Sequence, residues 1–405
     1  MKTRKRILIL SADAGFGHRS SALAIAAALG EQFGDRCQVK VVNPLNERRV
    51  PGLLRRSQQD YDRVVRNRPQ IYRLGYRMND LPVVSTLFLS SLTLLLFEGM
   101  RLILQDYQPD AVVVTFPLYH SALNACYAVT NRHIPTITVV TDLAEVHRLW
   151  FHRVADICAV GTERVAAVAA QRRIKASKVQ ITGLPVNPAF AQKPDDKTAL
   201  RQQLGWEPDK ITLLAVGSKR VGKLSEFLRP LNTAHLPIQL AIVTGGDDAA
   251  YRELQQTDWQ IPTHLYNFVE NMPQLMQAAD CLVSKAGGLI LTEGLAGGLP
   301  QIVIDAIPGQ ESGNLDYVVA NGAAAFAPEP DQLRTTVEQW LQEDGRLLHE
   351  HAQHAVRLGR PLAAYNVASL AWEAAQSGSH PIRRFNAKKR FATIFKSPTL
   401  KAGKP

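Results

Sequence analysis

The segment Lys285-Ala-Gly-Gly-Leu-Ile-Leu-Thr-Glu293 decides the fold of this chain. It follows the apolar run Cys281-Leu-Val283 and leads into an apolar stretch, which predicts a strand, a glycine turn and a helix. Backbone N–H groups at the start of such a helix form a site for phosphate. Glu293 lies near the end of the first two helical turns, where its carboxylate can accept hydrogen bonds from a ribose diol.

A second polar segment follows, Ile307-Pro-Gly-Gln-Glu-Ser-Gly-Asn314. In it, Gln310 and Glu311 offer an amide and a carboxylate that suit the hydroxyl groups of a sugar. Phosphate, ribose and hexose sites in this order predict a nucleotide sugar as ligand.

The rest of the chain repeats the same strand and helix alternation, which is typical of parallel sheets built from βαβ units. Expected strands of the first half are residues 7–10, 39–42, 111–114, 137–140 and 157–160. Expected strands of the second half are residues 211–216, 239–243, 265–266, 281–283 and 301–304. The turn-rich segment from Gly183 to Asp196 separates the two halves. The fold class is therefore α/β, with two Rossmann-like parallel-sheet domains that face each other across a cleft. We expect an acceptor and membrane-facing domain at 1–188, a sugar-nucleotide domain at 189–378 and a basic tail at 379–405.

Composition is that of a folded, soluble protein of two domains: 405 residues, 46% hydrophobic and 20% charged. The four cysteines are scattered without a C-x-x-C pair, so neither a zinc site nor a disulfide framework is predicted, and a reducing cytoplasm fits best. The basic N-terminus is followed by an apolar run too short for a signal peptide, which is expected to be the first buried strand.

Positive charge is concentrated in two stretches. Residues 380–405 hold eight Lys/Arg and no acid, and residues 48–77 hold nine arginines against Asp60 and Asp62. Both stretches also contain apolar side chains, as expected of segments that bind an anionic membrane surface. A solvated disordered tail or a nucleic-acid site are the alternatives. The apolar stretch 81–97 is too short to span a bilayer and predicts a buried or interface-lying helix, so the expected location is the inner face of the cell membrane.

The loop Ser11-Ala-Asp-Ala-Gly-Phe-Gly-His-Arg-Ser-Ser21 joins the first strand to the first helix. It is not a dinucleotide fingerprint, because Ser20 replaces the third glycine and Asn43 and Pro44 follow the second strand in place of an acid. The loop presents Gly17 and His18 at a helix start, which favours the neutral imidazole that a base requires. A capping or packing histidine is the alternative.

Asp142 ends the strand Val139-Val-Thr-Asp142 at the same edge of the sheet. His147 and Trp150 follow it closely, and we expect them to line an acceptor site in which the acid orients the reacting hydroxyl. The spacing of Asp142 to His147 and His152 matches no standard metal site. A capping aspartate beside a core tryptophan is the alternative.

The second half contains a further glycine loop, Val216-Gly-Ser-Lys-Arg-Val-Gly-Lys223. Gly217 could hold a phosphate through backbone N–H groups together with Lys219 or Arg220, although the full Walker spacing is missing. The backbone edge at 267–272 could pair with a base.

Taken together, these segments resemble the monogalactosyldiacylglycerol synthases and processive diacylglycerol glucosyltransferases, relatives of the N-acetylglucosaminyltransferase that makes lipid II. The resemblance covers roughly residues 7–322. Its most specific part is Lys285-Ala-Gly-Gly…Thr292-Glu293 with Pro308-Gly-Gln-Glu311…Asn314. The loop 13–19, the strand end 140–143 and the linker 183–186 support it.

The resemblance implies a GT-B fold and an inverting transfer from a UDP-sugar, with no cofactor and no bound metal. It implies that the helix start at Gly287 and Gly288, with Ala286, Thr292 and Asn314 of the same motif, holds the donor. Glu293 would bind the ribose, Gln310 and Glu311 the hexose, and Phe268 and Val269 would lie by the uracil. His18 would meet the acceptor hydroxyl, while Asp142 and Trp150 would line the acceptor side. Ile290 stands where relatives often carry a hydroxyl residue.

The leading hypothesis is transfer of glucose or galactose from a UDP-sugar to diacylglycerol, with His18, Asp142 or the two as a coupled pair accepting the proton. The alternatives are a polyprenyl-linked or other lipid alcohol as acceptor, a UDP-sugar epimerase of the same fold, and a membrane-associated UDP-sugar sensor.

Overall fold

The computed structural model describes residues 4–13, 16–47, 50–52, 82–194, 196–218, 224–307, 309 and 311–382. Most of both basic stretches lies outside the described residues, as do Lys219, Arg220, Pro308 and Gln310.

Within the described residues, two six-stranded parallel sheets form the framework of the molecule. The first sheet has the order β2-β1-β3-β5-β6-β7, with strands β1 (Lys5–Leu10), β2 (Cys37–Val42), β3 (Ala111–Val114), β5 (Thr136–Val139), β6 (Ile157–Val160) and β7 (Val179–Ile181). The second has the order β10-β9-β8-β11-β12-β13, with strands β8 (Ile211–Val216), β9 (Ile238–Val243), β10 (Thr263–Tyr266), β11 (Cys281–Lys285), β12 (Gln301–Asp305) and β13 (Ala324–Phe326). The expected pair of Rossmann-like sheets is confirmed.

Helices cover both faces of the first sheet. Helices α1 (Phe16–Phe33) and α14 (Ala363–Ser377) pack on one face, and α4 (Pro82–Tyr107) and α5 (His120–Thr130) pack on the other. Alternate residues of β1 explain this, because Ile7 and Ile9 point to α1 and α14 while Leu8 and Leu10 point to α4 and α5.

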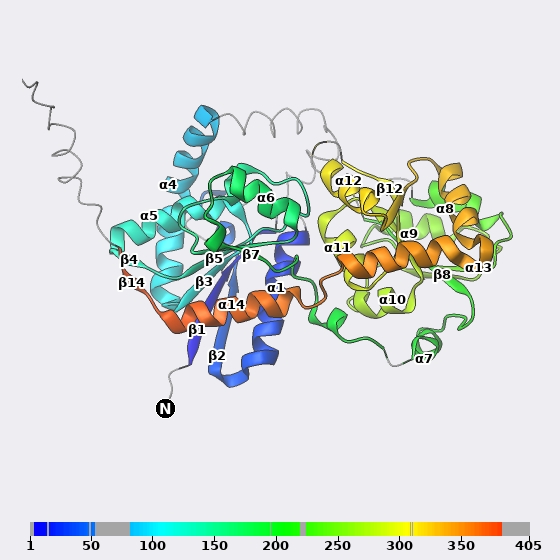
Figure 1. Cartoon of the computed structure of the whole chain (residues 1–405), viewed down its shortest axis with the longest axis horizontal. Helices are drawn as coiled ribbons and strands as arrows, with labels where there is room; N and C mark the ends of the chain where they lie inside the picture. The colour runs from blue at the N-terminus through cyan, green and yellow to red at the C-terminus, as the bar shows by residue number, and fades with distance from the viewer. Residues whose placement is uncertain are drawn as a thin grey trace, which may run out of the picture.

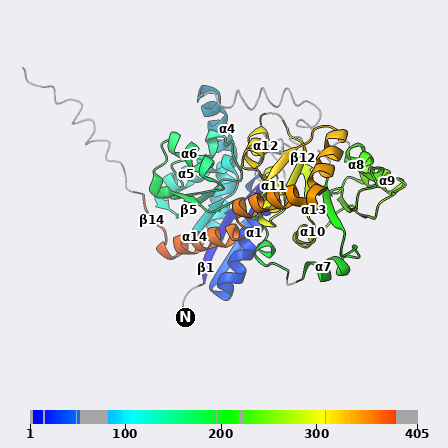
Figure 2. The same cartoon turned by 45° about the vertical axis from the view of Figure 1, so that its right-hand side comes forward.

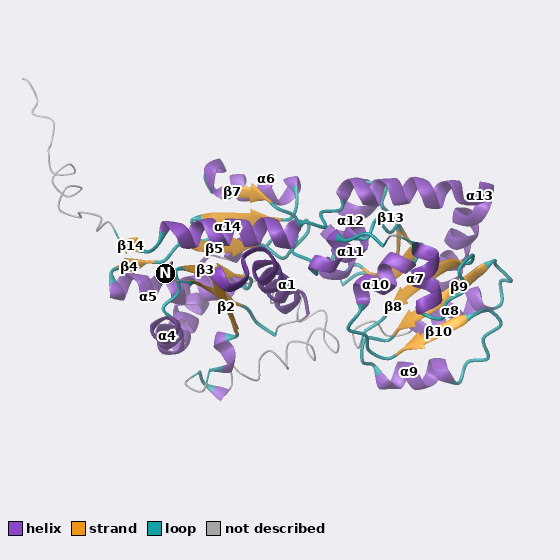
Figure 3. Ribbon diagram, turned by 90° about the horizontal axis from the view of Figure 1, so that it is seen from below, coloured by secondary structure: helices purple, strands orange, loops and turns teal. Residues whose placement is uncertain are grey.

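The second sheet is covered in the same way. Helices α8 (Leu224–Asn232), α9 (Asp248–Gln255) and α13 (Pro330–Leu358) lie on one face. Helix α10 (Met272–Ala278) lies on the other, next to α7 (Lys197–Gln203). Helices α11 (Gly288–Ala296) and α12 (Ser312–Ala320) complete the unit, and α11 lies beside α1 where the two units meet (Figure 3).

Helix α14 does not belong to the unit in which the sequence was expected to place it. The expected second domain extended to residue 378, but α14 crosses back to the first sheet and lies along α1 (Figures 1 and 2). Phe33 of α1 stacks on Trp372 of α14 with ring centroids 4.4 Å apart. Beyond α14, β14 (His380–Pro381) pairs antiparallel with β4 (Arg132–His133) of the first unit.

The chain therefore passes between the units twice, and the two passages touch. Gly183 has a φ of +86°, and a Cβ atom added to it would lie 2.5 Å from Cβ of Arg360. Only a glycine fits at this contact.

The expected helix over the apolar stretch 81–97 is part of α4. Leu92 and Leu96 are buried in the first core, whereas Leu94 is 79% exposed and Leu95 is 42% exposed. In the part of the chain that the structure describes, no helix is long and apolar enough to cross a membrane.

Candidate functional site

His18 lies in the first turn of α1, where the sequence placed it. Its Nδ1 atom is 2.9 Å from the hydroxyl oxygen of Thr141, and its backbone carbonyl accepts a hydrogen bond of 3.2 Å from the hydroxyl of Thr115. The imidazole packs edge-on against Phe116, with ring centroids 5.0 Å apart, and lies 6.0 Å from the ring of Trp150. Two hydrogen bonds and two ring contacts thus hold this residue at the switch point between β1 and β3.

Burial of the imidazole lowers the pKa of His18 to about 4, so the ring is neutral at pH 7. A neutral imidazole has one nitrogen able to accept a proton. No side chain among the described residues bonds to Nε2, which is therefore available to a ligand.

Asp142 follows β5 directly. Its Oδ2 accepts a hydrogen bond of 2.7 Å from the indole N–H of Trp150, which is buried. Burial of the carboxyl raises the pKa of Asp142 to about 6, against the lowering effect of that hydrogen bond. His18 and Asp142 are brought together by a shared neighbour, since both contact Trp150.

Two further residues, His147 and Gly17, were expected on the acceptor side. His147 caps a short 3-10 helix, and its Nδ1 accepts from the backbone N–H of Leu149. A Cβ atom added to Gly17 would meet no atom of the described residues within 4 Å. Among the residues that the structure describes, no group of His, Cys, Asp and Glu side chains is arranged to hold a metal ion.

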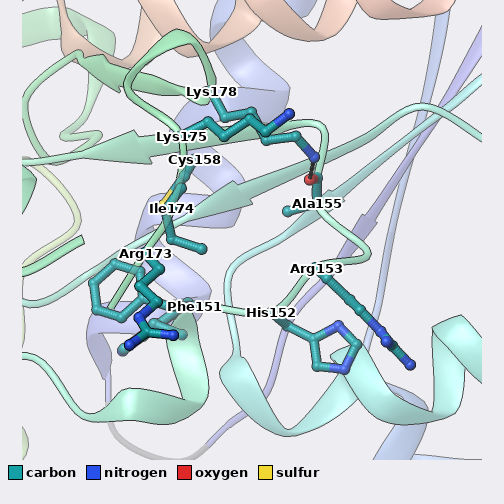
Figure 4. Close-up of a pocket in the computed structure, with 10 residues that line it drawn as sticks. Phe151, His152, Arg153, Ala155, Cys158, Arg173, Ile174, Lys175 and Lys178 are labelled. Carbon is teal, nitrogen blue, oxygen red and sulfur yellow. Dashed lines mark hydrogen bonds between the residues drawn. The ribbon is translucent and has the colours of Figure 1, made fainter. Parts of the chain in front are cut away.

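A pocket of about 160 Å³ lies next to the residues expected on the acceptor side. Figure 4 shows Phe151, His152 and Ile174 around it, with Arg153, Arg173, Lys175 and Lys178 also lining it. Trp150 lines it too, so the side chain that holds Asp142 is also a pocket wall. None of the residues expected to bind the donor lines this pocket.

In the second unit, α11 begins at Gly288 immediately after β11, as the sequence predicted. Gly287 is its N-cap, and no side chain caps the helix within the described residues. Strands β8 and β11 are neighbours across the switch point of this sheet, where ligands of doubly wound folds bind. The first turn therefore presents backbone N–H groups and the positive end of the helix dipole at the expected ligand position.

The carboxyl group of Glu293 has no hydrogen-bond partner among the described residues. Burial raises the pKa of Glu293 to about 8, so the side chain is mostly protonated at pH 7. A partly buried carboxyl with a raised pKa and no partner among the described residues is a candidate for contact with a ligand.

Other motif residues bond within the protein. Glu311 is 5% exposed and forms an ion pair with Lys285, while its second oxygen accepts from the backbone N–H of Ile307 at 3.0 Å. Asn314 donates to the carbonyl of Ala286 at 3.2 Å, and Thr292 donates to the carbonyl of Gly288 at 2.7 Å. The bonds of Glu311 and Asn314 tie the start of α11 to the segment after β12, whereas the bond of Thr292 lies within α11.

Ile290 packs with its side chain against an apolar cluster of the second unit. In the same unit, Phe268 is 64% exposed and Val269 packs partly against that cluster.

Gly217 lies at the end of β8, where a Cβ atom would meet Leu224 at 2.9 Å. The sequence did not single out Gly245, which has a φ of +64° and packs against the same loop. A Cβ atom on Gly245 would lie 2.6 Å from the carbonyl oxygen of Gly217. The pair Gly245-Gly246 directly after an apolar strand was the signal that could have identified it.

The loop after β5 connects the two candidate sites. A Cβ atom added to Gly288 would lie 3.6 Å from the backbone oxygen of Thr141. One added to Gly313 of α12 would lie 2.3 Å from Cγ of Glu145. The start of α11 therefore faces the segment that carries Thr141 and Asp142.

This architecture defines the class of the protein. Structures with the same fold include MurG of Acinetobacter baumannii, with a TM-score of 0.57, 17% identity and coverage of 91% of this chain and 99% of that one. Another is the UDP-GlcNAc 2-epimerase of Neisseria meningitidis bound to UDP-GlcNAc, with a TM-score of 0.58, 16% identity and coverage of 92% and 100%. The chain has the GT-B fold.

Sequence comparison is more specific. Residues 18–186 match the family described as monogalactosyldiacylglycerol (MGDG) synthase, and residues 196–358 match glycosyl transferases group 1. The probable chloroplastic monogalactosyldiacylglycerol synthase of Nicotiana tabacum is 32% identical over 373 residues, covering 90% of this chain and 69% of the relative. Monogalactosyldiacylglycerol synthase 2 of Arabidopsis thaliana is 30% identical, with 90% and 79% covered. The chain is a glycosyltransferase and belongs to the monogalactosyldiacylglycerol synthase family.

Proposed function

We propose that the chain transfers glucose or galactose from a UDP-sugar to diacylglycerol, with inversion and without a bound metal, to give a β-glycolipid at a membrane surface. The observation that carries the proposal is the contact between the start of α11 and the loop of Thr141 and Asp142. The contact brings the start of α11, the proposed phosphate site, close to His18 and Asp142, which both contact Trp150.

On the donor side, the diphosphate would lie at the start of α11, where N–H groups and the helix dipole stabilise the charge of the departing UDP. Glu293 would accept hydrogen bonds from the ribose, and Val269 with Phe268 would lie beside the uracil. Gln310 would contact the hexose. Glu311 would contribute mainly by holding Lys285, because both of its oxygens bond within the protein.

On the acceptor side, the hydroxyl oxygen of diacylglycerol would attack the anomeric carbon as the bond to the UDP oxygen breaks. Diacylglycerol carries a single hydroxyl proton, so only one of His18 and Asp142 can accept it. We assign this role to His18, because its Nε2 has no partner in the described structure, whereas Asp142 already bonds to Trp150. A negatively charged donor at α11 would raise the pKa of His18 and make it a stronger base.

The decisive experiment is incubation of the purified chain with UDP-glucose or UDP-galactose and vesicles containing diacylglycerol, with mass spectrometry of the lipid product. A hexosyl-diacylglycerol with a β linkage is the expected result. Transfer only to a polyprenyl-linked or another lipid alcohol would replace the acceptor, and a converted UDP-sugar without lipid product would indicate an epimerase.

The assignment of the base has its own test. With His18 as base, the His18→Ala variant binds UDP but makes no product, and kcat of the natural chain at saturating UDP-sugar falls at a pH set by His18, whose pKa is lowered to about 4 before the donor raises it. An acid limb near pH 6, with activity retained in His18→Ala and lost in Asp142→Asn, would assign the proton to Asp142 instead.

Membrane contact is the second half of the proposal. Leu94 and Leu95 project from α4 between buried neighbours, which supports insertion of this helix surface into lipid. The double variant Leu94→Gln/Leu95→Gln is expected to bind anionic vesicles more weakly in flotation assays. Val356→Gln is the matched control, because Val356 is an exposed apolar residue on the second unit. Equal loss in both variants would refute a specific role for α4.

A further inference from the structure

Thr141 is the residue through which the two halves of the candidate site meet. It lies between β5 and Asp142 and is only 8% exposed. Its hydroxyl oxygen is 2.9 Å from Nδ1 of His18, and its backbone oxygen faces the start of α11 at Gly288.

The hydrogen bond at Nδ1 determines where the other ring nitrogen lies. The two nitrogens are on opposite sides of an imidazole, so a ring bonded to Thr141 through Nδ1 turns Nε2 away from that strand. The ring of Phe116 packs edge-on against the imidazole with an angle of 73° between the ring planes, and the ring of Trp150 lies at 44° to it. These contacts restrict rotation of the imidazole about its Cβ–Cγ bond.

The tautomer of His18 depends on which of the two partners donates in this hydrogen bond. A threonine hydroxyl can donate or accept, so it is compatible with either neutral form of the imidazole. If Nδ1 carries the hydrogen and donates to Thr141, Nε2 has a free lone pair. If the hydroxyl donates to Nδ1, Nε2 carries the hydrogen and cannot accept a proton from a substrate.

We propose that Thr141 is a positioning residue for the transfer reaction: its hydroxyl holds His18 as the Nδ1–H tautomer with Nε2 open to the acceptor, while its backbone keeps the donor helix in register with that base. This inference rests on the proposed function, in which His18 is the base. Thr141 touches no reacting atom and acts through His18.

The first test compares Thr141→Val, which keeps the shape and removes the hydroxyl, with Thr141→Ser, which keeps the hydroxyl. The valine variant is expected to lose on the order of 10- to 100-fold in kcat, with the affinity for UDP unchanged. The serine variant is expected to recover most of the rate. A valine variant with the natural kcat, or a serine variant as slow as the valine one, would overturn the proposal.

A matched control is present on β5, the strand that precedes Thr141. Thr138 also bonds a histidine through its hydroxyl, at 2.7 Å from Nε2 of His120, but His120 is buried in the first unit. Thr138→Val removes an equivalent threonine–histidine bond and is expected to leave kcat within about twofold of the natural value. A loss equal to that of Thr141→Val would mean that any such change in β5 impairs the enzyme.

The second test does not depend on turnover. In ¹⁵N-histidine-labelled protein, the signals of His18 are assigned by their loss in His18→Gln and report which nitrogen carries the hydrogen. The Nδ1–H form is expected in the natural chain and in Thr141→Ser, and a mixture in Thr141→Val. If the natural chain makes no glycolipid but shows this pattern, the proposed function fails while the role of Thr141 in selecting the tautomer stands; an Nε2–H form in the natural chain would overturn that role.

Discussion

Glu293 leads to a quantitative prediction, because its partly buried side chain has no hydrogen-bond partner among the described residues and its pKa is raised to about 8. At pH 7 a group with this pKa is protonated in about ten molecules out of eleven. A ribose diol donates hydrogen bonds, so it favours the carboxylate and should expel the proton. We therefore expect UDP binding at pH 7 to release close to one proton from this side chain, about 0.8 if the pKa falls by two units and about 0.9 if it falls by three or more.

The sign of the pH dependence follows from this release. Below pH 8 the affinity for UDP should fall by up to about tenfold per pH unit, because the proton must leave before the ribose is bound, and above pH 8 this contribution should level off. Isothermal titration calorimetry in two buffers of different ionisation enthalpy measures the number of protons directly.

Glu293→Gln provides the control, because the amide keeps the shape but cannot titrate. Titration of the UDP phosphate is common to both proteins, so the difference between them isolates Glu293. The natural chain should bind UDP more tightly than the variant at pH 9 by about 1.5 to 3 kcal/mol, and the advantage should shrink towards pH 6. A proton release equal in both proteins, or a difference in affinity that does not change with pH, would refute the reasoning.

Three further predictions concern the fold and the chemistry. Gly359→Ala places a Cβ atom 2.2 Å from the backbone oxygen of Leu295. The variant should therefore be destabilised by about 1 to 3 kcal/mol and show a lower melting temperature in a thermal scan. An unchanged melting temperature would contradict the contact. The four cysteines are buried, and burial raises the pKa of Cys37 to about 11 and of Cys158 to about 12. A thiol reagent at pH 8 should therefore label them slowly in the folded protein and fully in denaturant. Rapid labelling of the folded chain would disprove this. Under the proposed metal-independent mechanism, the transfer rate should be unchanged in excess EDTA, and a loss of activity that Mn²⁺ restores would overturn it.

Much of the framework could be predicted because parallel strands buried on both faces are continuous apolar runs. Residues 111–114, 157–160 and 211–216 were predicted at their observed bounds for this reason. Strands β7 and β13 were missed, because they are short edge strands with partly exposed residues; β7 is interrupted by Gln180, and β13 is mostly alanine, which does not favour strands. The position of α14 was wrong because an alanine-rich helix carries no signal for which of two sheets it will cover.

In the candidate site, too, features that depend on neighbouring residues were predicted, whereas contacts between residues far apart in the sequence were not. The glycine turn before α11 and the position of His18 at a helix start follow from neighbouring residues and were confirmed. The bond between His18 and Thr141 joins residues 123 positions apart, and the ion pair between Lys285 and Glu311 joins residues 26 apart. Contacts of this kind depend on how the sheets bring loops together, which no local pattern encodes.

The contact between Gly183 and Arg360 also determines how the cleft can open. The second unit is an insertion between β7 and α14 of the first, so its relative motion is limited by two polypeptide connections that lie against each other. Because the two connections are adjacent, they permit rotation of the units about one axis and resist twisting or sliding of one unit past the other. Opening should therefore swing the start of α11 away from Thr141 and return it to the same place, which would let product leave without loss of alignment for the next cycle.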